Sequence, residues 1–426
     1  MNKNLNTDYT VLLHCLCCQS NNLQEVIDLG DQPLANSFHD NTKELPKYPL
    51  RLNVCKDCWH TQLSIAVNPD LLFKDYKYVS GTTQTLKDYF DWFALMAIDY
   101  CDLTYSTNKY VLDIGCNDGS QLNPFKDLGW NTYGIDPAEN IIPITSKNHI
   151  VKCGYFQDGN HFGSTKFDII IAQNVFAHTL KLTDFLYQCS NCLKDTGCIF
   201  IQVSQADMIE KNEFDTIYHE HISFFNVNSF INLLDQFNEK NYYGDPKIKL
   251  VLQEVIKTPI HGNSLIFVLA KDEELKQPFI DNELSMERNK GLYDINTYIN
   301  YANNIKQIKE DLHYNLTRSA QINGYTIVGY GAAAKGMTAL NYFNIPVKIE
   351  YIIDDAPMKQ GLYTPGLNIP VVPIETLKTV GLVGSNKILF IPLAWNFFEE
   401  IKTRIKAVRN STNDRFLKYF PKVEIK

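Results

Sequence analysis

The chain has 426 residues, of which 45% are apolar and 21% are charged, and this length is enough for about three domains with buried cores. Its 40 basic and 48 acidic residues give a net charge of −8, which disfavours nucleic acid as a partner because phosphate backbones select basic surfaces. Residues 1–9 are polar, and no stretch has the roughly eighteen consecutive apolar residues of a membrane helix. We therefore expect a cytoplasmic protein that binds neither a membrane nor nucleic acid.

Two Cys-x2-Cys pairs lie near the start of the chain. They consist of Cys15, Cys18, Cys55 and Cys58. An odd total of 11 cysteines is poor material for a disulfide scaffold, whereas two such pairs in a short module are typical of one structural Zn²⁺ with four thiolate ligands. The alternatives are reduced thiols without metal, or a contribution from Cys17 at the first pair. A further pair, Cys189 and Cys192, is interpreted as core packing.

Changes in the sequence pattern predict the borders of the first two domains. Residues 1–82 contain the cysteine pairs and short segments punctuated by proline and glycine, and they form the predicted zinc-binding domain. Residues 83–258 open with a helical pattern and continue with short apolar segments separated by helix-length stretches, which is typical of a mostly parallel α/β sheet. The expected strands are 111–114, 133–135, 167–172 and 198–203. A later helix is expected to begin at Asn226 or Asn228, since either is a suitable N-cap.

The last segment, 259–426, is predicted to form the third domain. It begins with a suggested strand pair around 261–264 and a charged, solvated stretch at 271–290. A long helix around 301–312 leads to a second strand, glycine loop and helix at 325–340. The predicted fold class is α/β, with an N-terminal zinc-binding module, a central Rossmann-like domain and a C-terminal Rossmann-like domain.

A glycine-rich turn follows the first expected strand of the central domain. The strand ends in Asp113, and Gly115 and Gly119 then let the backbone approach a ligand closely at the start of a helix. In methyltransferases that bind S-adenosylmethionine, such a turn holds the methionine portion, and an acid at the end of the second strand binds the ribose hydroxyls. Asp136 is placed for that role. The pattern favours a methyltransferase domain over the alternative of a purely structural turn.

A histidine follows the third expected strand of the same domain. His178 ends the segment 174–178, and the carboxyl ends of strands line the ligand crevice of an open α/β sheet. This position fits a ligand contact and a structural hydrogen bond equally well.

Four consecutive polar residues precede an aromatic segment, and they are Tyr218, His219, Glu220 and His221. If this stretch is extended, Tyr218 and Glu220 share one face and the two histidines share the other. The pattern favours a general base, because histidine titrates near pH 7. A metal site built on the His-x-His pair lacks an evident third ligand, and structural hydrogen bonding is the remaining alternative.

A second glycine-rich loop lies in the third domain. The segment 329–334 fits the G-x-G-x-x-A pattern of dinucleotide-binding loops, and Asp354 and Asp355 follow about 25 residues later, which is near the usual spacing of about 20. One interpretation is an NAD-dependent oxidoreductase. The other is a Rossmann-like scaffold without a redox cofactor, in which the loop and Lys335 form a phosphate site.

Taken together, these motifs resemble those of the three-domain sugar C-methyltransferases, which methylate a ring carbon of nucleotide-linked ketosugars. The resemblance is to the type that methylates C-3. The resemblance spans nearly the whole chain. Besides the two cysteine pairs, it rests on 33–38, Tyr76, Tyr78, 80–81, 113–115, 174–178, 218–221, 329–336, 354–355, 359–361, 365–366 and 393–396. One departure is Asn263, where the family usually has a second glycine; it could alter the turn after His261 but touches no expected catalytic residue.

The resemblance implies S-adenosylmethionine in the central domain, the sugar beside it, and a zinc ion remote from the chemistry. It also implies a C-terminal domain that helps to hold a dTDP-, GDP- or UDP-linked ketosugar without using NAD. The implied cofactor-binding residues are Asp113, Gly115, Asn117, Gly119, Asp136 and Asn174. The implied substrate-binding residues are His219, His261 and Lys335.

Catalytic roles also follow from the resemblance. His221 is expected to be the base that removes the proton next to the ketone, and Tyr218 and His178 to hold the keto oxygen or orient the sugar. Glu220 is expected to fix His221 or a sugar hydroxyl. Two tyrosines of the first domain are expected to close over the sugar, namely Tyr76 and Tyr78.

Two other functions remain as alternatives. The first is an NAD-dependent sugar oxidoreductase that uses the loop at 329–334. The second is a zinc-ribbon binding protein with a degenerate methyltransferase core, although the intact set Asp113, Gly115 and Asp136 argues against it.

Overall fold

The computed structural model describes residues 8–40, 44–76, 80–82, 84–103, 108–204, 207–239, 249–260, 263–271, 277–379, 387–409 and 411–426. Two of the predicted site residues, Tyr78 and His261, lie outside the described residues. Within these ranges no helix is both long enough and apolar enough to cross a bilayer.

The N-terminal domain is built on an antiparallel sheet that a strand of the central domain completes. The sheet has the order β11-β4-β3-β2, with β2 at Leu23–Gln32, β3 at Tyr48–Cys55, β4 at Thr61–Leu63 and β11 at Ser223–Phe224. Burial alternates along β3, because successive side chains of a strand point to opposite faces. The other elements are β1 (Tyr9–Val11), which pairs with β5 (Ile65–Val67), and α1 (Pro69–Phe73).

The central domain is a doubly wound sheet with the order β12-β13-β10-β9-β6-β7-β8 in the described residues. Its parallel strands are β6 (Tyr110–Ile114), β7 (Asn131–Asp136), β8 (Ile150–Cys153), β9 (Phe167–Gln173) and β10 (Leu193–Val203). All four strands that the sequence predicts are therefore present. The chain winds outward from β6 to β8 and then returns to β9, so the topological switch point lies between β6 and β9. Ligands of open α/β sheets bind at such a point.

Helices cover both faces of the central sheet, as its nearly unbroken apolar strands require. Ile169 and Ile171 of β9 pack on one face with α2, whereas Ile170 packs on the other with α5 and α7. The helices of this domain are α2 (Gln84–Tyr100), α3 (Leu122–Asp127), α4 (Ile142–Thr145), α5 (Leu182–Cys192), α6 (Met208–Lys211) and α7 (Val227–Glu239).

The central sheet continues past the predicted domain border at residue 258. Strands β12 (Val251–Thr258) and β13 (Ser264–Ala270) form the predicted antiparallel strand pair, and β13 pairs with β10 of the central sheet. The first strand of the segment 259–426 thus belongs structurally to the central domain. The sequence pattern could not show this, because a hairpin reads the same whichever sheet it joins.

The expectation of a solvated stretch at 271–290 is wrong for its second half. This half forms α8 (Gln277–Asn289), and Glu287 is buried against the start of α7. Its carboxylate accepts hydrogen bonds from the backbone N–H groups of Val227 (2.6 Å) and Asn228 (3.1 Å). Asn226 is the N-cap of α7, since its Oδ1 accepts from the N–H of Ser229 at 2.7 Å.

The C-terminal domain is a second doubly wound sheet, with the order β16-β15-β14-β17-β18-β19. Its strands are β14 (Thr326–Tyr330), β15 (Ile349–Ile353), β16 (Val371–Val372), β17 (Ile388–Pro392), β18 (Arg415–Lys418) and β19 (Glu424–Ile425). Its helices are α10 (Ala334–Phe343), α11 (Thr376–Thr379) and α12 (Phe398–Val408). The switch point here lies between β14 and β17, where the second glycine loop is.

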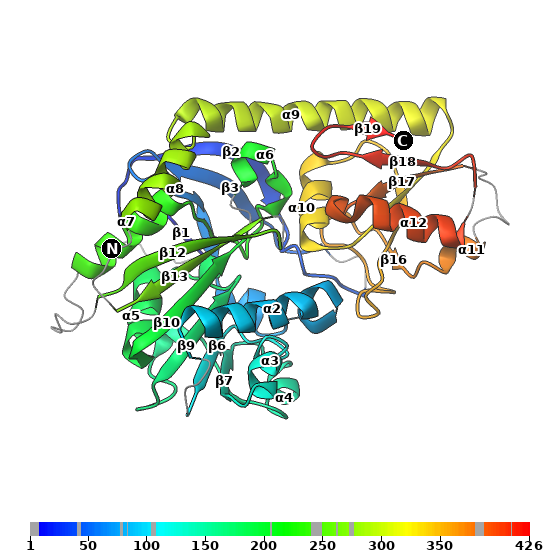
Figure 1. Cartoon of the computed structure of the whole chain (residues 1–426). Coiled ribbons are helices and arrows are strands. Elements are labelled where there is room, and N and C mark those ends of the chain that lie inside the picture. The colour runs from blue at the N-terminus through cyan, green and yellow to red at the C-terminus, as the bar shows by residue number, and fades with distance from the viewer. Residues whose placement is uncertain are drawn as a thin grey trace.

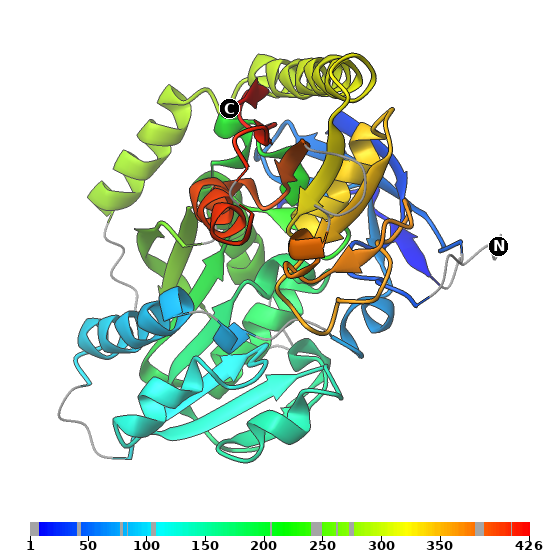
Figure 2. The same cartoon turned by 90° about the vertical axis from the view of Figure 1, so that its right-hand side faces the viewer.

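The long helix α9 (Ile295–Thr317) ties the domains together. Figure 1 shows it running along the top of the molecule, from the N-terminal strands on the left to the C-terminal domain on the right, and Figure 2 shows it nearly end-on. Its buried face, which includes Tyr301 and Ile305, shares one core with Leu52 of β3 and with Leu340 of α10. The N-terminal and C-terminal domains therefore pack into a common apolar core.

The cap that Glu287 supplies gives a test of this fold. Replacing Glu287 by Ala leaves two buried N–H groups of α7 without an acceptor and should lower the free energy of unfolding by about 1–3 kcal/mol. Chemical denaturation followed by circular dichroism measures the loss. Asp281→Ala, on the exposed face of the same helix, is the matched control and should change little. Equal stability of the two variants would contradict the cap.

Candidate active site and metal centre

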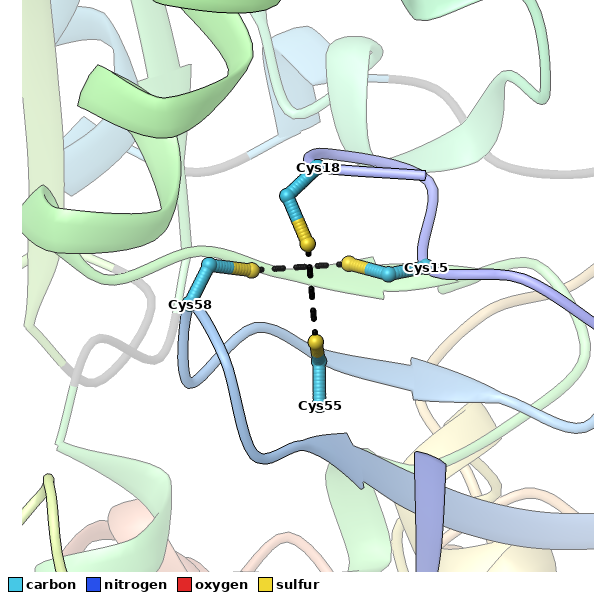
Figure 3. A group of neighbouring side chains, drawn as sticks. All are labelled: Cys15, Cys18, Cys55 and Cys58. Carbon is cyan, nitrogen blue, oxygen red and sulfur yellow. Dashed lines mark hydrogen bonds between the residues drawn. The ribbon is translucent and has the colours of Figure 1, made fainter. Parts of the chain in front are cut away.

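The four predicted zinc ligands converge in the structure. Cys15 and Cys18 come from a turn after β1, and Cys55 and Cys58 come from the end of β3 and the turn after it (Figure 3). Their sulfur atoms all lie within 4.8 Å of one another, with 3.5 Å between Cys15 and Cys58 and 3.6 Å between Cys18 and Cys55. Cys17 is not a member of this group.

The cluster fits a tetrahedral zinc ion. Four Zn–S bonds of about 2.3 Å separate the sulfurs by roughly 3.8 Å, close to the distances observed. Four thiolates fill the coordination shell, so this metal would fix the fold of the N-terminal domain and leave no position for a substrate.

The first glycine-rich loop leaves β6 at the switch point of the central sheet. Gly115, Asn117 and Gly119 have φ angles of 73°, 45° and 80°, in the left-handed region that glycine and asparagine tolerate best. Asp136 at the end of β7 fixes the loop, because its carboxylate accepts the N–H of Asn117 at 2.9 Å and that of Ala138 at 2.8 Å. Each carboxylate oxygen thus keeps a free lone pair for a ribose hydroxyl.

A second acid and an orphaned amide lie beside this loop. Asp113 is buried at the end of β6, and burial, together with the charges of Asp136 and Asp118, raises its pKa well above the usual range. Asn174 follows β9 on the other side of the switch point, and its Oδ1 is buried with no hydrogen-bond partner in the described residues. An acceptor without a partner at this place fits the polar groups of S-adenosylmethionine.

The linker from the N-terminal domain lies over the glycine-rich loop. The N–H of Ser80 donates to Asn117 at 3.1 Å, and that of Gly81 donates to Asp118 at 3.0 Å. A Cβ on Gly81 would come 2.2 Å from the hydroxyl oxygen of Ser120 and 2.8 Å from Oδ2 of Asp118, so a larger residue there would require these side chains to move. Ser80 and Gly81 are among the residues on which the family resemblance rests, and their contacts with the glycine-rich loop give a physical reason for their presence.

Four rings form a stacked column beside the switch point. Phe73 of α1 stacks on His178, with ring centroids 5.6 Å apart, and His178 stacks on His221 at 5.2 Å. Tyr218 also lies against His221, with ring centroids 4.1 Å apart and the rings tilted by 38°. Burial lowers the pKa of His178 to about 4, so that it is neutral at pH 7, and its Nε2 has no partner among the described residues.

The tautomer of His221 follows from two short hydrogen bonds of its ring, to the Thr216 carbonyl and the Tyr218 hydroxyl, whereas the Thr216 hydroxyl lies 3.5 Å from Nδ1. Its Nδ1 lies 3.0 Å from the carbonyl oxygen of Thr216, which can only accept, so Nδ1 carries the proton. Its Nε2 is therefore the basic nitrogen, and it accepts a 2.8 Å hydrogen bond from the hydroxyl of Tyr218. The backbone turns at this point, since the N–H of His221 donates to the carbonyl of Tyr218. The segment is thus not extended, and Tyr218 and His221 meet on one side.

Glu220 is buried between side chains of the N-terminal domain and the linker. Its carboxylate accepts from Asn36 Nδ2 at 2.6 Å and from the hydroxyl of Tyr76 at 3.1 Å. Burial raises the pKa of Glu220 to about 7, and the two hydrogen bonds oppose this shift only in part. Glu220 is therefore a second group that can exchange a proton near neutral pH.

Two predicted substrate contacts are placed differently. His219 is buried against the N-terminal sheet, where its Nε2 donates to the carbonyl of Tyr48 at 3.2 Å, and this favours a structural role. Lys335 does not face an open phosphate site: its Nζ is buried and lies near the carboxylates of Glu213 and Asp215. The turn at 218–221 and the packing of α10 on the central domain account for these two positions.

The second glycine loop is closed by its own domain. Asp354 accepts the N–H groups of Ala332 (2.6 Å) and Ala356 (2.8 Å), as Asp136 does in the central domain. A Cβ on Gly331 would come 3.1 Å from the Cβ of Ala394 and 3.2 Å from its backbone nitrogen, so the loop after β17 packs directly against this glycine. This packing favours a scaffold over an NAD site.

Sequence reasoning missed three residues that complete the site. Asn36 holds Glu220, Phe73 supports His178, and Thr216 fixes the tautomer of His221. Asn36 lies in the segment 33–38, which is part of the family resemblance, so the sequence did contain a signal that could have identified it. The other two carry no chemical signature of their own, and only the fold brings them to the histidines.

Three family models match successive parts of the chain: "Putative zinc binding domain" over residues 15–73, "Methyltransferase domain" over 89–242 and "C-methyltransferase C-terminal domain" over 259–421. The C-methyltransferase NovU of Streptomyces niveus is 26% identical over 400 residues, which cover 91% of this chain and 90% of NovU. A ubiquinone biosynthesis O-methyltransferase of Rhodopseudomonas palustris is 31% identical over 97 residues, or 21% of this chain and 38% of that protein. The solved structure of an S-adenosylmethionine-dependent methyltransferase from Clostridium acetobutylicum is 13% identical and covers 43% of this chain and 92% of its own, with a TM-score of 0.34.

The cysteine cluster gives the first test of this section. The purified, undialysed protein should contain about one zinc per chain by elemental analysis. Cys55→Ser should lose the metal and unfold at a lower temperature, whereas the folded fraction should still bind S-adenosylmethionine. Cys153→Ser is the control, because Cys153 is exposed on β8 and outside the cluster. A zinc-free wild-type protein of normal stability would contradict the assignment.

The burial of Glu220 gives the second test. Its pKa is near 7 in the folded chain but near 4.5 when exposed, so the unfolded chain loses this proton first as pH rises. Glu220 should therefore cost stability increasingly between about pH 4.5 and pH 7. Glu220→Gln cannot ionise, and its melting temperature relative to wild type should rise across this window. Glu310→Gln, at an exposed position of α9, should show no such trend. A constant difference for Glu220→Gln would refute the raised pKa.

Proposed function

Because this chain belongs to the three-domain S-adenosylmethionine-dependent C-methyltransferases, we propose that it methylates a ring carbon, C-3, of a nucleotide-linked 4-keto-6-deoxy sugar. The observation that carries the proposal is the pair formed by His221 and Tyr218, in which the basic Nε2 faces a phenol hydroxyl at 2.8 Å. This pair lies beside the switch point where the cofactor loop begins.

The chemistry of carbon methylation explains why such a pair is needed. S-adenosylmethionine supplies an electrophilic methyl group when it is bound. An ordinary sugar carbon is not a nucleophile, but a neighbouring ketone makes its proton removable, because the charge moves onto the ketone oxygen as an enolate. The enzyme therefore needs a base near neutral pKa and a donor for that oxygen.

The residues of this chain can be given these roles. His221 Nε2 removes the α-proton, and the Thr216 carbonyl stabilises the imidazolium that results. The Tyr218 hydroxyl, which donates to Nε2 in the structure, can turn its proton to the enolate oxygen once the sugar is bound. His178, neutral and with a free Nε2, orients the sugar. The carboxyl group of Glu220 and the hydroxyl of Tyr76, which are hydrogen-bonded to each other in the structure, bind a sugar hydroxyl.

Cofactor and nucleotide are assigned to the two Rossmann-like domains. Asp136 binds the ribose of S-adenosylmethionine, while Gly115, Asn117 and Gly119 shape the loop below it. The C-terminal domain helps to hold the dTDP, GDP or UDP portion of the sugar nucleotide. The zinc ion keeps the N-terminal domain folded and takes no part in the chemistry.

The substrate is tested by product analysis. The protein is incubated with S-adenosylmethionine and a panel of dTDP-, GDP- and UDP-linked 4-keto-6-deoxy sugars, and the products are examined by mass spectrometry. A gain of about 14 mass units, one CH₂, that stays on the sugar ring supports the proposal. No gain with any member of the panel, or a methyl group found on oxygen, would overturn it.

The base is tested by His221→Asn. The asparagine amide can still donate to the Thr216 carbonyl but has no lone pair in place of Nε2. Turnover should fall by roughly two to four orders of magnitude, the usual worth of a positioned general base. The affinity for both ligands should hardly change, because neither depends on the proton transfer in the ground state. Turnover close to wild type in this variant would move the base to another residue.

Asp136→Ala is the contrasting variant. It should weaken S-adenosylmethionine binding by roughly 1–3 kcal/mol, the scale of a charge-assisted hydrogen bond, and titration calorimetry measures the change. The two variants together separate cofactor binding from proton removal.

A further inference from the structure

The turn that orients His221 is not self-supporting. It is the short 3-10 helix η4 (Phe214–Thr216), which ends with a hydrogen bond from the N–H of Ile217 to the carbonyl of Phe214 at 3.0 Å and has no side-chain cap. Helical turns this short are unstable alone, because each fixes several dihedral angles for few hydrogen bonds. Something outside the turn must therefore set the direction of the Thr216 carbonyl.

The C-terminal domain supplies that support. Phe214 packs against Tyr342 and Phe343 of α10, with ring centroids 5.4 Å and 5.2 Å apart. Asp215 is fully buried, and its Oδ2 accepts a 2.7 Å hydrogen bond from the indole N–H of Trp395. The η4 turn of the central domain is thus fixed at two successive residues by the domain that ends the chain.

Trp395 is the main donor to Asp215. The Tyr419 hydroxyl also lies 3.2 Å from Oδ2, but it is 2.9 Å from the carbonyl oxygen of Leu393, so its single proton is divided between two acceptors. The Oδ1 of Asp215 is buried and has no partner in the part of the chain that the structure describes. The indole itself is held by Phe420, at 4.5 Å between ring centroids.

We propose that Trp395 is a positioning residue for proton removal: by donating its indole N–H to Asp215, it fixes η4 so that the Thr216 carbonyl keeps the His221 proton on Nδ1. This rests on the proposed function only in naming His221 as the base. Without the anchor, Asp215 seeks another donor, the Thr216 carbonyl turns away, and His221 populates the other tautomer. The Nε2 nitrogen then carries a proton and cannot accept one from the sugar.

The proposal is tested with Trp395→Phe, which removes the N–H and keeps an aromatic ring. Turnover should fall by roughly 10- to 100-fold, the range seen when a hydrogen bond that orients a metal-binding residue from outside its site is lost. The KM for the sugar nucleotide and the affinity for S-adenosylmethionine should stay within about twofold, because the substitution removes the hydrogen bond to Asp215, and Asp215 is not among the proposed ligand contacts.

The tautomer is read separately, without substrate. In the full chain labelled with ¹⁵N-histidine, the His221 signals are those that disappear in His221→Asn. Wild type should show the form protonated on Nδ1, and Trp395→Phe should show a mixture. Tyr419→Phe, which deletes one oxygen atom, should shift the tautomer and turnover in the same direction but less. Asp215→Asn, which keeps an acceptor oxygen for the indole, should stay closer to wild type than either.

Tyr298→Phe is the matched control. It removes a buried tyrosine hydroxyl that donates to the carbonyl of Leu292 at 3.0 Å and not to a residue of η4. It should lower stability as Tyr419→Phe does but leave the tautomer and turnover unchanged. The proposal is overturned if Trp395→Phe, or Tyr419→Phe should the former not fold, keeps the wild-type tautomer. A tautomer shift together with an active His221→Asn would instead leave the positioning role intact and refute His221 as the base.

Discussion

Most polar groups on the buried segment 213–224 have hydrogen-bond partners, and no single domain supplies all of these partners. The C-terminal domain binds Asp215, and the N-terminal domain and linker bind Glu220. Strand β4 pairs with β11 at the end of the segment, and the N–H of Ile222 donates to Ala177 of the central domain. The three domains therefore converge on one stretch of chain, and the geometry of His221 is a property of all three together.

Local patterns in the sequence predicted the elements that local physics determines. The four central strands, the glycine-rich loops and the four clustered cysteines depend on periodicity, on backbone freedom and on short spacing, and the structure contains all of them. The turn at 218–221 and the burial of Glu287 could not be predicted in this way. Both arise because the surrounding domains supply partners that lie tens to hundreds of residues away in the chain.

The two glycine-rich loops show what a sequence fingerprint measures. Asp136 and Asp354 make the same pair of hydrogen bonds to backbone N–H groups, so each loop has the same support. The space in front of the loops differs, because Ala394 lies against Gly331 whereas the linker residue Gly81 crosses the first loop. A glycine pattern thus reports a backbone shape, and the residues that face it decide whether a ligand can enter.

The contacts of segment 213–224 also impose an order on the completion of the molecule during synthesis, since domains fold from the N-terminus as the chain emerges. Phe224 follows Thr61 by 163 residues, and until it appears β4 presents an unpaired edge that can recruit a wrong strand. Trp395 emerges 180 residues after Asp215. A ribosome that stops before residue 395 therefore releases a chain that contains every histidine of the site and the whole cofactor loop, yet lacks both Trp395 and Tyr419, which hold Asp215 in place.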